Sequence, residues 1–234
     1  SVLPLIIPIL LAHIISANNF GKKTLEWNNE INYLTISKRL LIFLFSTLVT
    51  LILFQPYMFL DFSSYLSDIF TQSSMVNMNV DWPFTRQYID TPKYFYQIFQ
   101  LSKWGLGPIL GVICWISLVH ILIDSFLYKR KVELIILSWV IPYFLITGWF
   151  DVKFLRYMLP LVPFLLIFAS RSLFLFYEKS INWNKIFSLL PIALVLITTI
   201  HYSFAFVSIY SEPHPSVLAS EWLKENTKNG DKIL

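Results

Sequence analysis

Charged residues are scarce in this chain of 234 residues. Asp, Glu, Lys and Arg together make up 14% of it, whereas hydrophobic residues make up 56% and the mean hydropathy is +0.62. A soluble domain is normally about one-quarter charged. Six glycines and twelve prolines are too few for a fibrous or low-complexity chain. These shortages exclude the ordinary soluble and fibrous classes and indicate an integral membrane protein.

Cysteine and short chemical motifs are also rare. The single cysteine, Cys114, excludes an intrachain disulfide and a zinc site built from several thiolates. The sequence has no metal-ligand spacing, no glycine-rich phosphate loop and no nucleophile elbow. The net charge of +4 comes from basic residues that lie between apolar runs, where they mark topology, so no nucleic acid partner is expected.

Six long apolar stretches predict an all-α fold, a polytopic transmembrane helical bundle. A spanning helix needs about 20 apolar residues, and lipid tolerates only segments whose backbone hydrogen bonds are closed internally. The first stretch is shorter, so we expect it to be truncated and the chain to be a fragment cut at both ends. Its transmembrane domain would cover 1–210, and 211–234 would begin an extracytoplasmic segment or soluble domain. The predicted spans are Val2–Ile15, Leu40–Leu60, Trp104–Leu127, Val132–Phe150, Tyr157–Tyr177 and Ile186–Tyr210.

Basic residues predict the orientation of these helices in the cytoplasmic (plasma) membrane. They gather in alternate connections, which the positive-inside rule places in the cytoplasm. Residues 61–103, the short link 151–156 and the tail from Ser211 then lie on the opposite, extracytoplasmic side. The cytoplasmic set is Lys22, Lys23, Lys38, Arg39, Lys129, Arg130, Lys131, Lys179 and Lys185.

The outer loop, residues 61–103, should contain two amphipathic helices that lie along the membrane surface. In DFSSYLSDIFTQSSM, apolar residues recur at helical spacing after Asp61, a natural N-cap. In TPKYFYQIFQLSKW, we expect Thr91 to be the cap and Pro92 the first helical residue.

The stretch DWPFTRQYIDTP, residues 81–92, joins these two helices and should be irregular because of Pro83 and the turn before Pro92. Non-helical backbone this close to the bilayer must line a protein cavity or contact water. The sequence therefore predicts a partly covered pocket on the outer face that is open to a polar substrate. Structural roles stay open for the same side chains. Asp81 and Asp90 could cap turns, and Arg86 could pair with either acid or with a lipid phosphate. Tyr88 and Trp82 could be interfacial anchors.

A second polar group lies in DVKFLRYMLPLVP, residues 151–163. Lys153 and Arg156 are three residues apart with Tyr157 beside them, and on a helix they would share a face. Two such cations can hold a phosphate, arginine as a bidentate fork and lysine as a point charge. The alternative is that both side chains reach toward lipid headgroups.

Polar residues inside the predicted spans have simpler interpretations. We expect Asp124 to pair with Lys129 or Arg130, because a lone acid in the membrane is unfavourable. We expect His120 and His201 to be buried and hydrogen-bonded to neighbouring helices.

Several segments occur along the chain in an order that resembles a known family. They are QPYMFLDF, QSSM, DWPFTRQYIDTPKYFYQ, LSKWGLGPILG, VKFLRYMLPLVPFLLIFAS and PHPSVLASEWLKENTKNGDKIL. From about Gln55 to the end, the chain resembles the C-terminal part of the membrane domain of prokaryotic glycosyltransferases related to the protein O-mannosyltransferases, relatives of glycosyltransferase family 39 in the GT-C superfamily.

The resemblance implies transfer of a sugar from a polyprenyl-phosphate donor to a hydroxyl of a protein, lipid or glycan acceptor at the outer face of the bilayer. A carboxylate would activate the acceptor, and cations would stabilise the departing phosphate. That acid lies in the first outer loop of the family, upstream of this fragment, which alone should be inactive. Lys153, Arg156 and Tyr157 would bind the lipid phosphate. The residues that would shape the sugar pocket are Asp81, Arg86, Gln87, Tyr88 and Asp90. The resemblance fixes no cofactor and leaves a divalent cation as an option.

Two other functions remain open at the level of the sequence. A transporter or flippase of lipid-linked glycans would use the same cavity and cations without a general base. Broken helices or charges deep in several spans would favour it, and the sequence has few of either. A non-catalytic membrane scaffold would use the aromatic outer loop as a docking surface. An acidic residue in a short loop after the first span of the complete protein would favour the transferase.

Overall fold

The computed structural model describes residues 3–18, 33–182 and 184–227. It is 85% helical, and the part of the chain that it describes contains no strand. Five of its helices are long and apolar enough to cross a bilayer, which confirms the all-α, multi-pass membrane architecture. These are α2 (Tyr33–Phe54), α6 (Pro108–Tyr128), α7 (Lys131–Trp149), α8 (Val162–Ser180, preceded by the apolar turn η4, Leu155–Leu161) and α9 (Lys185–Ser208). Lys22, Lys23 and residues 228–234 lie outside the described residues.

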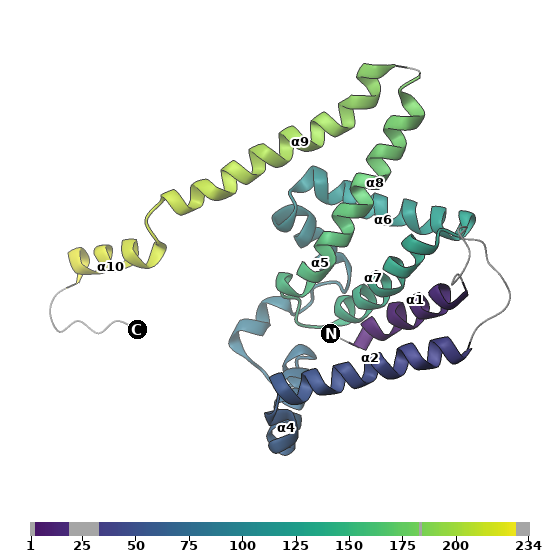
Figure 1. The fold of residues 1–234 in the computed structure, drawn as a ribbon. Helices are drawn as coiled ribbons and strands as arrows, with labels where there is room; N and C mark the ends of the chain where they lie inside the picture. The colour runs from purple at the N-terminus through teal and green to yellow at the C-terminus, as the bar shows by residue number, and fades with distance from the viewer. Residues whose placement is uncertain (1–2, 19–32, 183, 228–234) are drawn as a thin grey trace.

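The first apolar stretch forms a shorter helix, α1 (Ile6–Asn18), after the turn η1 (Leu3–Leu5). Helix α1 lies between α2 and α7 (Figure 1). The second predicted span, Leu40–Leu60, extends too far, because α2 ends at Phe54 and a separate short helix, α3 (Tyr57–Leu60), follows. Pro56 explains the break, since proline has no backbone N–H and disfavours helical geometry in the residue before it.

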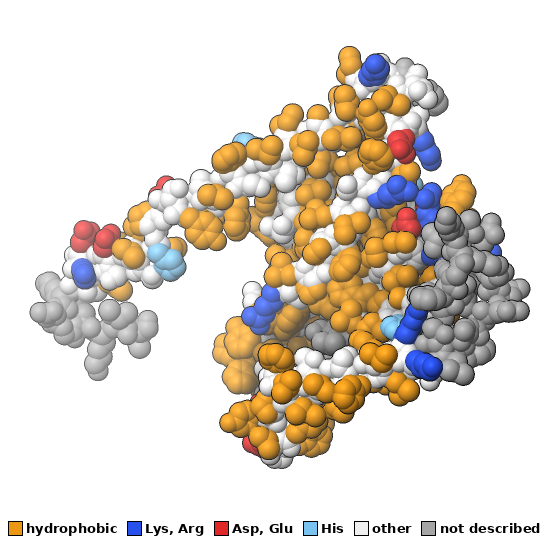
Figure 2. All heavy atoms as spheres, viewed as in Figure 1, with side chains coloured by type: hydrophobic (Ala, Val, Ile, Leu, Met, Phe, Trp, Pro, Cys, Tyr) orange, Lys and Arg blue, Asp and Glu red, His pale blue; other side chains and the backbone are white. Residues whose placement is uncertain are grey.

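The core lies where α6, α7 and α8 meet. Cys114, Val140, Leu165 and Phe168 are each almost fully buried there. By contrast, α2 and α9 expose nearly all their apolar side chains, and hydrophobic side chains cover much of the face seen in Figure 2. An all-round apolar surface of this kind is what a lipid-facing helix requires.

The connections from α6 to α7 and from α8 to α9 lie at one end of the bundle, which we call the basic end. Asp124 is only 15% exposed, and its Oδ2 lies 2.6 Å from Nε of Arg130, which confirms the predicted ion pair. His120 Nδ1 lies 2.9 Å from Ser172 Oγ on α8, so the predicted bond to a neighbouring helix is confirmed, although the histidine is exposed rather than buried.

The outer loop begins with α4 (Phe62–Val76), and Asp61 caps it by accepting a hydrogen bond of 3.2 Å from Ser64 N, as predicted. The stretch 81–92 is not irregular throughout, because it contains the 3₁₀ helix η2 (Pro83–Tyr88). The second loop helix, α5 (Phe95–Gln100), starts later than the predicted cap at Thr91. The chain can become helical only after Tyr94, which has a φ of +60° and donates from its backbone N–H to Gly148 O.

A π-helical turn, η3 (Leu101–Gly105), connects α5 to α6. Two glycines make this junction tight. A Cβ at Gly111 would lie 2.4 Å from Cα of Ser102, and Gly107 has a φ of +85° beneath the ring of Tyr202 on α9. The backbone of η3 can therefore lie directly against the first turn of α6.

Helix α9 leaves the bundle beside α8 and carries α10 (Pro215–Asn226), after the turn η5 (Ile209–Ser211), at its far end (Figure 1). His214 caps α10 by accepting a hydrogen bond of 3.2 Å from Ser216 N. Pro215 suits the first helical position, because its missing N–H needs no partner there.

Candidate functional site at the loop end of the bundle

The outer loop packs against residues 150–156, which are the link between α7 and η4 and the first two residues of η4, at the end of the bundle opposite the basic end. Val152 N donates to Val76 O at 3.0 Å, and Tyr94 N donates to Gly148 O at 3.2 Å. The two regions that the sequence predicts to lie on the same side of the membrane are therefore in direct contact. We call this contact region the loop–link interface.

Side chains of α5 and of Tyr94, just before it, reinforce the loop–link interface on the α7 side. Gln97 is 1% exposed, and its Nε2 donates to Thr147 O at 2.8 Å. The hydroxyl of Tyr94 donates to Leu145 O at 3.1 Å, and its ring packs so tightly on Gly148 that a Cβ there would lie 2.3 Å from it. Sequence reasoning missed these residues. Gln97 could have been noticed in the sequence, because it lies within the apolar segment FYQIF. A buried side-chain amide there needs a hydrogen-bond partner.

Lys153 is 4% exposed and points into the loop–link interface. Its Nζ donates to Thr91 Oγ1 at 3.0 Å and to Asp151 O at 2.9 Å. Burial lowers the pKa of Lys153, because it disfavours the charged ammonium; Asp151 opposes this effect and Lys93 adds to it. Lys153 precedes η4, so the helical face that it was predicted to share with Arg156 does not form.

Lys93 and Asp151 form a partly exposed ion pair beside Lys153. Their Nζ and Oδ1 atoms lie 3.0 Å apart, and the Lys93 ammonium lies 4.1 Å from the ring centroid of Trp149. The pair connects the turn before α5 to the link. Sequence reasoning did not single out Lys93, because nothing local shows that residues 93 and 151 meet.

Arg156 is the exposed cation of the loop–link interface. The central carbon of its guanidinium lies 4.3 Å from the ring centroid of Phe154 and 5.7 Å from that of Tyr157. Such contacts favour one orientation of the guanidinium while leaving its N–H donors free for a ligand. No carboxylate among the described residues forms a salt bridge with it.

Aromatic rings connect the outer loop to Arg156. Phe154 lies 6.3 Å from Phe84, 5.5 Å from Tyr88 and 5.6 Å from Tyr157, measured between ring centroids. Tyr88 is 7% exposed, and its burial raises the pKa of its hydroxyl. Because Tyr88 is buried, its ring packs inside the outer loop and stabilises it, and is not open to solvent.

The other predicted residues of 81–92 are exposed. Arg86 and Asp81 form a bidentate ion pair, in which Nη2 lies 2.5 Å from Oδ2 and Nε lies 2.8 Å from Oδ1. The hydrogen bonds of this pair lower the pKa of Asp81 and raise that of Arg86. Gln87 donates to Phe84 O within its own turn at 2.9 Å. Asp90 has a φ of +59°, as turn residues do. Of the alternatives for Arg86, pairing with an acid is the one observed.

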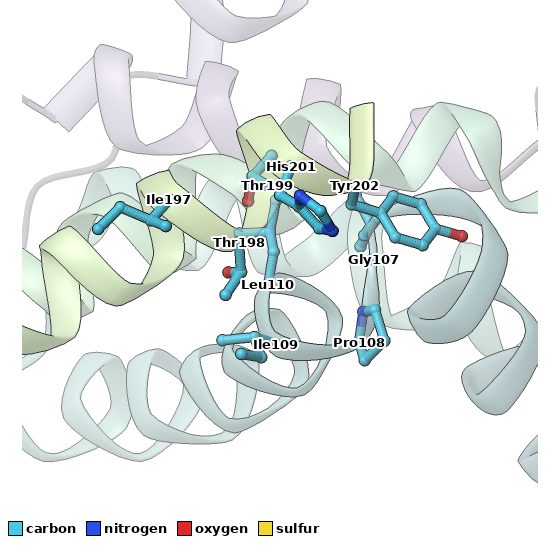
Figure 3. A pocket seen from close by; sticks show the side chains of 10 residues that line it. Gly107, Pro108, Ile109, Leu110, Ile197, Thr198, Thr199, His201 and Tyr202 are labelled. Carbon is cyan, nitrogen blue, oxygen red and sulfur yellow. The ribbon is translucent and has the colours of Figure 1, made fainter. Parts of the chain in front are cut away.

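An apolar cavity of about 510 Å³ opens between the start of α6 and the middle of α9 (Figure 3). His201 lines it, is exposed, and has no hydrogen-bond partner among the described residues, so the predicted buried and bonded role is wrong. Tyr202 closes one side by donating to Lys103 O at 2.6 Å. The lining is Leu106, Gly107, Pro108, Ile109, Leu110, Ile197, Thr198, Thr199, His201 and Tyr202.

Metal ligands do not cluster in the part of the chain that the structure describes, where no three His, Cys, Asp or Glu residues converge. No family model matches this chain, and neither a curated protein nor a solved structure shows significant similarity to it.

Proposed function

We propose that this protein is a glycosyltransferase that moves a sugar from a polyprenyl-phosphate donor to a hydroxyl acceptor at the loop end of the bundle, on the outer face of the membrane. The loop–link interface is the observation that supports this proposal most. It gathers Arg156, Lys153 and the loop 81–92 at the end opposite the basic connections, where the family resemblance expects the donor.

Arg156 is the residue that we propose for the donor phosphate. It is exposed, oriented by Phe154 and free of a carboxylate partner, and a guanidinium can bind a phosphate through two parallel hydrogen bonds. Lys153 takes a different part in this proposal. Its ammonium is buried against Thr91 and Asp151, so it positions the link that leads to Arg156 and Tyr157 in η4.

The apolar cavity between α6 and α9 supports a lipid-linked donor (Figure 3). It begins at Leu106, next to Gly105, and a Cβ at Gly105 would lie 4.0 Å from Leu155, the neighbour of Arg156. A donor whose phosphate binds Arg156 would thus have an apolar space nearby for part of its chain.

We do not propose Asp81 or Asp90 of the outer loop as the general base. Asp81 is held by Arg86, and its lowered pKa makes it a weaker base. In this proposal the Asp81–Arg86 pair, Gln87, Tyr88 and Asp90 shape the approach to the donor.

The test uses the full-length protein in lipid nanodiscs with radiolabelled polyprenyl-phosphate sugars and a panel of hydroxyl acceptors. We expect transfer from one of the donors, and Arg156→Ala should lower kcat/KM by about 10- to 100-fold, the effect of losing one charged hydrogen-bonding group. Lys103→Ala is the matched control, because Lys103 is another exposed cation at this end that lies over aromatic rings. Absence of transfer from every donor, or equal rates in Arg156→Ala and the wild type, would refute the proposal.

A further inference from the structure

A second cavity lies on the outer loop, between α4 and the segment Val80–Trp82. It has a volume of about 530 Å³, and we call it the α4 groove. None of its lining side chains is charged. The lining consists of Ser63, Leu66, Ser67, Phe70, Thr71, Ser74, Val80 and Trp82.

One wall of the α4 groove is a row of hydroxyl groups. Ser63, Ser67, Thr71 and Ser74 follow one another at intervals of four, four and three residues, which places them on one face of α4. Thr71 Oγ1 donates to Ser67 O at 2.9 Å, which leaves its lone pairs free to accept. Within the described residues, the hydroxyls of Ser67 and Ser74 have no side-chain partner, so each can both donate and accept.

The opposite wall contains the indole ring of Trp82. Trp82 is 41% exposed, and its ring is stacked on Phe84 at a centroid distance of 5.9 Å. A flat aromatic surface, held in place from one side, therefore lies across the groove from the hydroxyl row.

This combination selects a class of ligand. A phosphate or carboxylate would need cations, and the lining has none. A hydrocarbon chain would deprive the hydroxyls of water without replacing their hydrogen bonds, which is unfavourable. A neutral sugar matches both walls, because its hydroxyls can bond to the serines and the threonine while its C–H face packs on the indole.

Ring contacts connect the α4 groove to the proposed donor site. The ring of Trp82 stacks on that of Phe84, whose centroid lies 6.3 Å from that of Phe154. The central carbon of the Arg156 guanidinium lies 4.3 Å from the centroid of Phe154. A ligand in the groove and a phosphate at Arg156 would therefore contact opposite ends of the same row of rings.

We propose that the α4 groove binds a neutral carbohydrate and that the acceptor of the sugar transfer is a glycan. The second part rests on the proposed function, whereas carbohydrate binding itself does not require transfer.

Binding is measured on the full-length protein in nanodiscs by saturation-transfer NMR and calorimetry, with maltose, cellobiose and mannobiose as neutral probes. We expect saturable binding of one of these disaccharides, weakened about tenfold or more by Trp82→Ala. Ser67→Ala and Ser74→Ala should each weaken it about three- to tenfold, and alanine favours the helix, so α4 should stay folded. Trp222→Ala, an exposed tryptophan on α10, should leave binding unchanged.

Several results would overturn the inference. They are no saturable binding of any probe, equal binding by Trp82→Ala and the wild type, or binding of a serine- and threonine-rich peptide in place of the sugars. Transfer to a peptide with no disaccharide binding would reject the groove and leave the transferase standing. Disaccharide binding without transfer from any donor would support the groove and reject the proposed function.

Discussion

The ammonium of Lys153 donates a hydrogen bond of 3.0 Å to the hydroxyl of Thr91, a residue 62 positions earlier in the chain. Thr91 in turn donates to Tyr88 O at 2.6 Å, so the lysine is linked to the end of η2 through one side chain. A buried cation thus fastens the outer loop to the link that precedes α8.

Replacing Lys153 with methionine should loosen the outer loop. Methionine keeps the length of the side chain but leaves Thr91 and the Asp151 carbonyl without their donor, and unsatisfied buried groups cost about 1–3 kcal/mol each. We expect a lower unfolding temperature and faster proteolysis within residues 77–94. Lys103→Met is the control. If Lys153→Met unfolds at the same temperature as the wild type, Lys153 does not fasten the loop.

The lowered pKa of Lys153 predicts how stability changes at alkaline pH. Between the folded pKa and the ordinary value of 10.5, the unfolded chain binds more protons than the folded chain, so the contribution of Lys153 to stability rises with pH. Below the folded pKa, both states are protonated and the contribution is constant. The measurement is the unfolding free energy of the wild type minus that of Lys153→Met, from about pH 8 to about pH 11. A difference that falls or stays flat over this range contradicts the prediction.

Gly148→Ala should disrupt the contact between α7 and the start of α5. The added methyl would lie 2.3 Å from the ring of Tyr94, which must then move away from its hydrogen bond to Leu145 O. Overpacking of this kind destabilises by about 1–3 kcal/mol. Gly105→Ala is the matched control, because its methyl meets Cδ1 of Leu101, the far end of a flexible side chain. Equal unfolding temperatures for the two variants would show that Tyr94 is not locked against α7.

Cysteine labelling can test which side of the membrane holds each end of the bundle. The natural Cys114 is buried, so it should not react. We expect Asp90→Cys, in the exposed turn of the outer loop, to react with an impermeant maleimide in intact cells. Lys129→Cys, at the basic end, should react only after the membrane is opened. Labelling of both positions, or of Lys129→Cys alone, in intact cells would reverse or reject the proposed orientation.

Hydropathy predicted the helices of the membrane domain well, because the length of an apolar run is a property of the sequence itself. Asp61 and Asp124 were also predictable, since their partners lie within a few residues along the same helix or just beyond its end. Two helix boundaries were predicted wrongly from local sequence. Pro56 divides a stretch that hydropathy predicted as one span. Thr91 has the sequence of a helix cap, but the hydrogen bond between Tyr94 and Gly148 delays the start of α5.

The candidate site was predictable only in part. The sequence indicated that the outer loop and the link belong to one end of the bundle, and the structure places them in contact. It could not show that Lys153 turns inward and Arg156 outward, because that choice depends on Thr91 and Phe154, which meet these residues only in the folded chain. Lys93 and Gln97 were missed for the same reason, since their partners are about 50 residues or more away.

The glycine at position 107 lets α9 lie close to the start of α6. Its missing side chain lets the ring of Tyr202 settle over the backbone, and a Cβ there would lie 3.3 Å from that ring. A side chain at position 107 would crowd this ring, which would have to shift by a few tenths of an ångström, and it would be strained by the backbone φ of +85°. Gly107 therefore sets how closely Tyr202 can approach α6 and close one side of the apolar cavity between α6 and α9.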